Sequence, residues 1–371
     1  MQWSPQQEHA LSEITKWLHS DSSPQLFRLF GYAGTGKTTL ITEIANIARG
    51  EVLYMAYTGK AALIMQKKGC YGASTIHSAI YRAIEDKETG KIEYVLNMDS
   101  KVASCSLVII DEVSMVNQEI GEDLLQFGKK ILIIGDPFQL PPVSGEGYFT
   151  SGEPDVMLTE IHRQAKDNPI IRLSIDIREG KNLALQQYDE CSVLSRRDAK
   201  GAEFRQNLLT CDQVLCGMNK TRVNLNNAIR IQSGIANMDD PHEPKISDKL
   251  ICIKNNRKKG ILNGGLWRVN SAFESSTFVM SLSSLDELGH ADIDVNVPRE
   301  FFEGTEETLN WKYRKKIDEF TFGYALTVHK SQGSQWGNVV IIDESPVFRE
   351  HSSRHLYTGV TRAAEKVTIY I

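Results

Sequence analysis

Short runs of consecutive apolar residues, separated by longer polar or amphipathic stretches, form the first pattern in this chain. In the first half these runs are LFRLF (26–30), VLYMAY (52–57), LVIID (107–111) and ILIIGD (131–136). Uninterrupted apolar runs of this length are typical of strands buried on both faces of a parallel sheet. Residues 6–18, before the first run, carry apolar positions at helical spacing. The pattern therefore predicts an α/β domain over residues 1–152.

The same pattern returns near the end of the chain after a long interruption. VVIID (339–343) and KVTIYI (366–371) are apolar runs, and they predict a second parallel-sheet domain built from residues 153–244 and 321–371. The stretch between them, 245–320, contains alternating runs such as LICIK and LWRVN. Alternation of apolar and polar residues is typical of strands with one buried face, so this stretch predicts a small β-rich insertion in the second domain.

A polar stretch over residues 83–104 interrupts the first domain. Thr89-Gly90 in this stretch could turn a short hairpin that stands outside the sheet, and Tyr94 is the only aromatic residue of the candidate strands. A surface excursion without function is the alternative. The stretch therefore predicts a hairpin insertion whose role depends on the rest of the chain.

The composition limits the class of protein without choosing a function. The chain has 371 residues, 41% hydrophobic and 24% charged, which fits a globular protein of about two domains. No segment approaches the roughly 18 apolar residues of a membrane span, and the opening MQWSPQQEHAL has no secretory pattern. We therefore expect a cytoplasmic protein, of a bacterial cell or a phage-infected host, with no membrane partner.

The charge and the cysteines exclude two further classes. A net charge of -5 argues against a protein that coats nucleic acid by bulk electrostatics, so any nucleic-acid path must be a local groove. The six cysteines are scattered, without a CxxC pair or a nearby histidine at zinc-ligand spacing. We expect reduced thiols and no zinc site.

A glycine-rich turn follows the first apolar run directly. GYAGTGKT, residues 31–38, matches the spacing of a phosphate-binding loop between a strand and a helix. Its glycines allow backbone N–H groups to face phosphates at a helix N-terminus; Lys37 supplies a positive charge and Thr38 a hydroxyl for Mg²⁺. The residues predicted to hold the nucleotide are Gly34, Thr35, Gly36, Lys37, Thr38 and Thr39. The chain is expected to use ATP and Mg²⁺.

Two later strand ends carry polar residues that complete such a site. Asp111 and Glu112 end the run LVIID, where carboxylates are costly unless they serve a cation or a water molecule. We assign Asp111 to Mg²⁺ and Glu112 to orienting the attacking water. Gln139, in ILIIGDPFQLPPV, is a candidate sensor of the γ-phosphate; a rigid loop shaped by the neighbouring prolines is the alternative.

Together with further motifs in a fixed order, these sequences resemble the superfamily 1 helicases, in particular the RecD/Dda-like 5′-to-3′ branch. The further motifs are TGKAA (58–62), STIH (74–77), EIHRQ (160–164), YALTVHKSQGSQW (324–336) and LYTGVTRAAEKV (356–367). They span nearly the whole chain, so a shared phosphate-binding loop alone does not explain them. The resemblance implies two RecA-like domains.

The resemblance assigns further residues to the nucleotide. Gln7 in WSPQQ falls at the family's adenine-contacting glutamine, with Gln6 as its nearest competitor. Arg163 in HRQ and Arg362 in VTRA fall where the family places second-domain arginines on the γ-phosphate. The planar fork of an arginine suits this stabilisation of charge, so we expect both arginines to take part in catalysis.

The resemblance also implies a track for single-stranded DNA. The residues at the family's DNA-contacting motifs are Thr58, His77, Thr327, His329 and Ser331. Small polar groups of this kind grip phosphates and rings stack on bases; for each residue, a satisfied core or loop polar group is the alternative. The hairpin corresponds to the family's duplex-splitting pin, and the insertion at 245–320 corresponds to its SH3-like accessory domain.

The sequence as a whole predicts an ATP-dependent DNA helicase that moves 5′ to 3′ on single-stranded DNA and unwinds duplex. Because the chain begins near the glutamine motif and ends one strand after Arg362, we expect a small free-standing motor that acts as a monomer. A DNA-stimulated ATPase that remodels protein–DNA complexes is one alternative, which the short hairpin favours. An RNA-directed helicase is another, since nothing in the sequence reads a 2′-hydroxyl.

Overall fold

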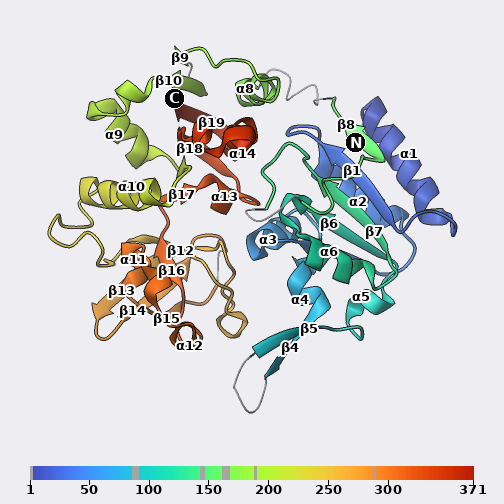
Figure 1. Ribbon diagram of the computed structural model, residues 1–371, viewed down its shortest axis with the longest axis horizontal. Helices are drawn as coiled ribbons and strands as arrows, with labels where there is room; N and C mark the ends of the chain where they lie inside the picture. The colour runs from blue at the N-terminus through green and yellow to red at the C-terminus, as the bar shows by residue number, and fades with distance from the viewer. Residues whose placement is uncertain (1–2, 86–91, 143–146, 161–167, 188–189, 288–289) are drawn as a thin grey trace. The chain divides into compact units, whose positions relative to one another are not determined.

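The computed structural model describes residues 3–85, 92–142, 147–160, 168–187, 190–287 and 290–371 (Figure 1). The chain divides into two compact units, Met1–Arg172 and Leu173–Ile371. Each unit holds a six-stranded sheet, and the second also holds a five-stranded one. The expectation of an α/β protein with two parallel-sheet domains is therefore confirmed.

The sheet of the first unit is parallel throughout. Its strands, in spatial order, are β3 (Ser74–Thr75), β2 (Val52–Ala56), β6 (Leu107–Asp111), β7 (Lys130–Gly135), β1 (Leu26–Gly31) and β8 (Val156–Leu158). The central strands are buried on both faces, as their unbroken apolar runs predict. All strands end at one edge of the sheet, and the loops at that edge carry the site.

Helices pack against both faces of this sheet (Figure 1). They are α1 (Pro5–His19), α2 (Lys37–Ile47), α3 (Gly59–Lys67), α4 (Ile76–Ile80), α5 (Lys101–Ser104), η1 (Val113–Met115) and α6 (Gln118–Leu125). A capping box starts α1: the Ser4 hydroxyl accepts from the Gln7 N–H, and the Gln7 side chain accepts from the Ser4 N–H. This box fixes Gln7 at the start of the helix, where it faces the phosphate-binding loop.

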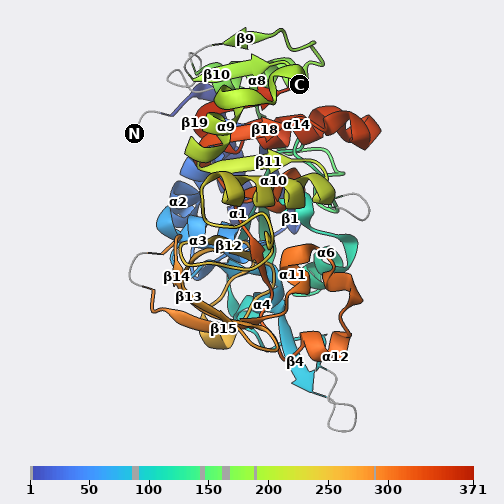
Figure 2. The same ribbon diagram turned by 90° about the vertical axis from the view of Figure 1, so that its left-hand side faces the viewer.

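The hairpin consists of β4 (Tyr81–Glu85) and β5 (Ile92–Leu96), which pair in antiparallel register. It begins two residues before the predicted start at 83, and the residues up to 104 include α5 as well as β5. Its turn, with the predicted Thr89-Gly90, lies outside the described residues. Figures 1 and 2 show the two strands extending away from the six-stranded sheet, beyond α4.

The expected domain boundary after residue 152 is wrong. Strand β8 pairs with β1, with Leu29 opposite Val156, and so completes the first sheet. The first compact unit accordingly runs to Arg172, within α8 (Pro169–Arg178). Three residues of a short edge strand carry no local mark of the sheet they join, so the sequence pattern alone could not assign them.

The second unit contains another six-stranded sheet, parallel except for its edge strand β9. Its order is β17 (Ala325–Thr327), β11 (Gln213–Cys216), β18 (Trp336–Ile342), β19 (Ala363–Tyr370), β10 (Cys191–Leu194) and β9 (Gln186–Gln187). The main helices of the unit are α9 (Gly201–Thr210), α10 (Asn219–Gln232), α13 (Val328–Ser331) and α14 (Ser352–Val360), with η5 (Ser345–His351) before α14. Leu208 of α9 and Ile229 of α10 belong to the core on one face of the sheet.

The predicted β-rich insertion is an antiparallel five-stranded sheet within the second unit. Its order is β15 (Ile293–Val297), β14 (Phe278–Ser284), β13 (Leu266–Glu274), β12 (Lys249–Cys252) and β16 (Phe320–Phe322). Short helices α11 (Glu300–Glu303) and α12 (Trp311–Arg314) lie between β15 and β16. Strands β14 and β15 alternate between more and less buried residues, as the sequence pattern predicts for this sheet, whereas the short strands β12 and β16 are buried on both faces. The sheet has a core of its own.

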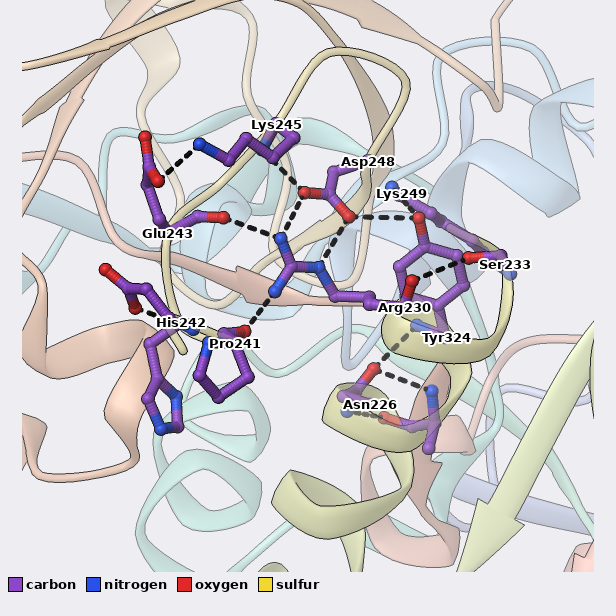
Figure 3. Close-up of polar contacts among 12 residues, drawn as sticks. Asn226, Arg230, Ser233, Pro241, His242, Glu243, Lys245, Asp248, Lys249 and Tyr324 are labelled. Atoms are coloured by element: carbon purple, nitrogen blue, oxygen red, sulfur yellow. Dashed lines mark hydrogen bonds and ion pairs between the residues drawn. The ribbon is translucent and has the colours of Figure 1, made fainter. Parts of the chain in front are cut away.

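A buried ion pair connects this inserted sheet to α10 (Figure 3). Arg230 of α10 and Asp248, next to β12, are both fully buried, and the Arg230 Nε and Nη2 atoms each lie 2.7 Å from one Asp248 oxygen. Arg230 also donates to the carbonyl oxygens of Pro241 and Glu243 and lies over the Phe322 ring. One guanidinium thus ties together the start of the insertion, its last strand and the helix of the parallel sheet.

No helix among the described residues is both long and apolar enough to cross a membrane.

Candidate nucleotide site and nucleic-acid interface

The phosphate-binding loop adopts the conformation that its glycines predict. Gly34 and Gly36 have φ angles of 80° and 77°, in the left-handed region that residues with a Cβ rarely adopt. Gly36 is the N-cap of α2, and no side chain caps this helix. The first backbone N–H groups of α2 therefore lack side-chain acceptors and are suited to an anion.

The Lys37 side chain bonds two backbone carbonyl oxygens at the start of the phosphate-binding loop. Its Nζ atom lies 2.6 Å from the carbonyl oxygen of Gly31 and 2.9 Å from that of Tyr32. Thr35 is buried, and its hydroxyl donates to the Tyr32 carbonyl oxygen at 2.9 Å. The ammonium group is thus held at the mouth of the loop, where a phosphate could exchange for the carbonyl oxygens.

Asp111 lies at the carboxyl end of β6, close enough to Lys37 and Lys68 for their charges to act on its carboxyl. Burial, and then the neighbouring Glu112 carboxylate, raises the pKa of Asp111 to about 6, although the two lysines and the Glu112 N–H work in the opposite direction. A carboxylate in this position is destabilised in the absence of a cation. Glu112 itself has a positive φ of 55°, which turns the chain sharply after the strand.

The raised pKa predicts that Asp111→Asn stabilises the nucleotide-free protein. The pKa of Asp111 in the folded state lies above its unfolded value of 3.8. The free energy of unfolding therefore falls as pH rises from about 4 to about 6, and the full destabilisation by the ionised Asp111 is present above about pH 6. We expect the variant to gain about 3 kcal/mol in free energy of unfolding at about pH 8 and almost nothing at about pH 4. Urea unfolding at both pH values measures this.

Asp99→Asn is the matched control, because Asp99 is an exposed residue of the same unit. This variant should leave the free energy of unfolding within about 0.5 kcal/mol at either pH. An equal gain for both variants would contradict the assignment of an electrostatically destabilised carboxylate at position 111. A gain for Asp111→Asn that does not depend on pH would also contradict it.

A pocket of about 500 Å³ opens beside the start of α2. Its lining residues are Trp3, Thr38, Thr39, Thr42, Glu43 and Lys68. The sequence predicted Thr38 and Thr39 only. Thr42 and Glu43 follow one helical turn later, a spacing that could have indicated them, whereas Trp3 and Lys68 reach the pocket through folding alone.

The structure separates the two candidate glutamines. Gln7 is buried, and its Nε2 atom donates to the Thr35 carbonyl oxygen of the phosphate-binding loop at 3.1 Å. Gln6 instead bonds Thr159 and Glu160 next to β8. Of the two, Gln7 is the one that contacts the loop. Its adenine contact remains a prediction, because both ends of its amide already bond the protein.

Gln139 and Arg362 are both buried in the structure. Gln139 is buried in the loop after β7, where the Asp136 carboxylate and backbone shape the turn. Arg362 is buried in the second unit, and its guanidinium donates to the carbonyl oxygens of Ser334 and Thr358 at 3.1 Å. Arg163 lies outside the described residues.

Two of the predicted DNA contacts lie at neighbouring strand ends of the first sheet. Thr58 follows β2 and caps α3, where its hydroxyl accepts from the Ala61 N–H at 3.1 Å. His77 follows β3 and belongs to α4. Since β2 and β3 pair in parallel, both residues lie along the carboxyl edge of the sheet, and a capping hydroxyl still carries a proton that it can donate.

The corresponding edge of the second sheet carries the other three. Thr327 ends β17 and caps α13. Burial and the charge of His351 lower the pKa of His329, which favours a neutral ring. Ser331 is fully buried and donates to the Val328 carbonyl oxygen at 2.7 Å. The Ser331 side chain therefore stabilises the turn of α13 and does not line a surface, in contrast to the prediction.

Together, the parallel sheets, the phosphate-binding loop and the acidic strand end define a phosphate-loop NTPase with two RecA-like sheets. Residues 2–198 match the family model described as AAA domain, and residues 322–370 match that of the UvrD-like helicase C-terminal domain. The chain belongs to the AAA domain family, and its C-terminal residues are similar to UvrD-like helicase C-terminal domains. The resemblance inferred from the motifs is confirmed.

Individual relatives agree with this placement. The chain is 28% identical over 373 residues to the ATP-dependent RecD2 DNA helicase of Deinococcus radiodurans, covering 92% of this chain and 46% of the relative. It is 24% identical to the ATP-dependent DNA helicase Pif1 of Bdellovibrio bacteriovorus, covering 89% and 80%. The chain spans less than half the length of the first curated relatives it matches.

The fold has solved counterparts. A crystal structure of Bacteroides Pif1 bound to ssDNA superposes with a TM-score of 0.62 at 18% identity, covering 100% of this chain and 92% of that one. Pif1 from Candida albicans gives a TM-score of 0.58 at 19% identity, covering 100% and 94%. At this level of identity the likeness establishes the fold.

Proposed function

We propose that this chain is an ATP-dependent motor that moves along single-stranded DNA, 5′ to 3′, and separates duplex DNA. The observation that carries the proposal is the nucleotide site of the first unit, where the phosphate-binding loop, Lys37 and the destabilised Asp111 carboxylate meet. The same chain contains a region similar to UvrD-like helicase C-terminal domains. The loop and carboxyl alone would suit many NTPases. Their combination with the second domain favours a helicase.

ATP and Mg²⁺ fit the residues at the loop. The Thr38 hydroxyl and the Asp111 carboxylate are hard oxygen donors of the kind that Mg²⁺ takes together with phosphate oxygens, and a divalent ion there would offset the burial that raises the pKa of Asp111. Lys37 would pair with the β- and γ-phosphates in place of the two carbonyl oxygens it now holds. Glu112 would orient the attacking water.

Residues outside the phosphate-binding loop would complete catalysis and hold the DNA strand. Arg362, and Arg163 by motif position, would stabilise charge on the γ-phosphate when the domains close. Thr58 and Thr327, which cap helices at the edges of the two sheets, would hold successive phosphates of the strand, and the neutral His329 ring would stack on a base. Alternation of grip between the two domains would convert each hydrolysis cycle into a step.

Steady-state ATP hydrolysis with and without a single-stranded DNA oligomer tests the proposal. We expect DNA to stimulate hydrolysis at least about tenfold, and a forked duplex with a 5′ single-stranded tail to be unwound in preference to one with a 3′ tail. Stimulation by RNA instead would indicate an RNA-directed motor. Stimulation by DNA without unwinding of either fork would favour a remodelling ATPase, and absence of any stimulation would refute the motor.

A further inference from the structure

His77 occupies the junction between the carboxyl edge of the first sheet and the hairpin. It is the second residue of α4, directly after β3, and α4 leads into β4. Its ring centroid lies 4.7 Å from that of Tyr81 at the start of β4 and 4.5 Å from that of Tyr94 in β5. One imidazole thus contacts both strands of the hairpin.

The register of the hairpin explains why both tyrosines reach the same ring. Tyr81 pairs with Leu96 and Ala83 pairs with Tyr94. Directly opposed residues of an antiparallel pair point to the same face, and residues two apart along a strand share it. Tyr81 and Tyr94 therefore lie on one face of the hairpin, and His77 packs against this face.

Among the contacts between described residues, Tyr81 is anchored independently of His77 through its hydroxyl. The Tyr81 hydroxyl donates to an Asp123 carboxylate oxygen of α6 at 2.5 Å, which fixes the base of β4 to the body of the unit. Burial and this carboxylate raise the pKa of Tyr81, so the hydroxyl keeps its proton. Tyr94, with 58% of its surface exposed, has the edge-on contact with His77 as its one ring contact in the described part of the unit.

An isolated two-stranded hairpin is at best marginally stable, so its orientation depends on contacts at its base. We propose that His77 is a positioning residue for the separation of duplex DNA. Its ring, packed on Tyr94, holds the hairpin in a fixed orientation relative to the carboxyl edge of the six-stranded sheet, where Thr58 lies. This inference rests on the proposed helicase function and gives His77 a mechanical role in place of the direct contact with DNA that its motif predicts.

Unwinding of a 5′-tailed fork, measured beside DNA-stimulated ATP hydrolysis, tests this role. We expect His77→Ala and Tyr94→Ala each to reduce unwinding about five- to tenfold, the order that loss of one aromatic pair allows. Tyr94→Ala, at a position that is not among the predicted DNA contacts, should keep hydrolysis on single strands within about twofold of wild type. His77→Phe should restore unwinding, because it keeps the ring and removes the nitrogens. Tyr71→Ala is the matched control, since Tyr71 is 86% exposed in the same unit.

Hydrogen exchange of the amides of 92–96 provides a readout that needs no DNA. Exchange there should rise in His77→Ala and stay at the wild-type level in His77→Phe and Tyr71→Ala. Unwinding as poor in His77→Phe as in His77→Ala, with exchange unchanged, would overturn the positioning role and favour a contact through the ring nitrogens. Equal loss of hydrolysis and unwinding in Tyr94→Ala would also overturn it. Failure of the wild-type protein to unwind any fork would refute the proposed helicase function before any variant is compared.

Discussion

Replacement of Lys37 by alanine is expected to reduce kcat for ATP hydrolysis by at least about a hundredfold, the scale seen when one preorganised charge or donor is removed from a transition state. Lys37 supplies the ammonium group at the mouth of the phosphate-binding loop, 2.6 Å from the Gly31 carbonyl oxygen. No other lysine belongs to the loop. Steady-state hydrolysis with a single-stranded DNA oligomer measures the effect.

Two controls make this result specific to the loop. Lys101→Ala, at an exposed position in α5 of the same unit, should leave hydrolysis unchanged. Lys37→Ala should still bind single-stranded DNA, because the proposed DNA contacts lie at other strand ends, and its free energy of unfolding should change by no more than about 1 kcal/mol for the lost carbonyl contacts. A Lys37→Ala protein that hydrolyses ATP at the wild-type rate would refute the nucleotide site.

Arg230→Met is expected to destabilise the second unit by about 3–5 kcal/mol, because it leaves the Asp248 carboxylate buried without its partner. Both side chains have no exposed surface. The variant also loses the bonds to the Pro241 and Glu243 carbonyl oxygens and the contact with the Phe322 ring, so the inserted sheet loses its tie to α10 (Figure 3). Urea unfolding measures the free energy of unfolding.

Lys181→Met is the matched comparison, because Lys181 pairs with Asp176 and Glu179 at the surface of the same unit, with 57% of its side chain exposed. Its loss should change the free energy of unfolding by about 0.5 kcal/mol or less. Arg230→Met with Asp248→Leu should recover much of the loss, since a buried pair replaced by apolar residues is often tolerated. Destabilisation by Arg230→Met no larger than by Lys181→Met would contradict the buried pair.

The sequence by itself determined the elements whose structure follows from local residues. The loop around Gly34 and Gly36 has the predicted conformation, because left-handed backbone at these two positions needs glycine. The apolar runs became central strands, because a strand buried on both faces has no place for polar residues. The order of the motifs also predicted the resemblance to RecD- and Pif1-like helicases that the relatives show.

Only the tertiary structure decided which distant residues meet. The pairing of β8 with β1, the contact of Gln7 with the Thr35 carbonyl oxygen and the approach of Tyr94 to His77 each join segments whose local sequence does not record the partner. The burial of Ser331 is of the same kind, because a hydroxyl in a motif can face a strand of DNA or its own helix with equal local propensity. Local patterns specify backbone conformation and which strands are apolar, whereas contacts over long sequence separations, and the direction in which a single polar side chain points, arise from packing.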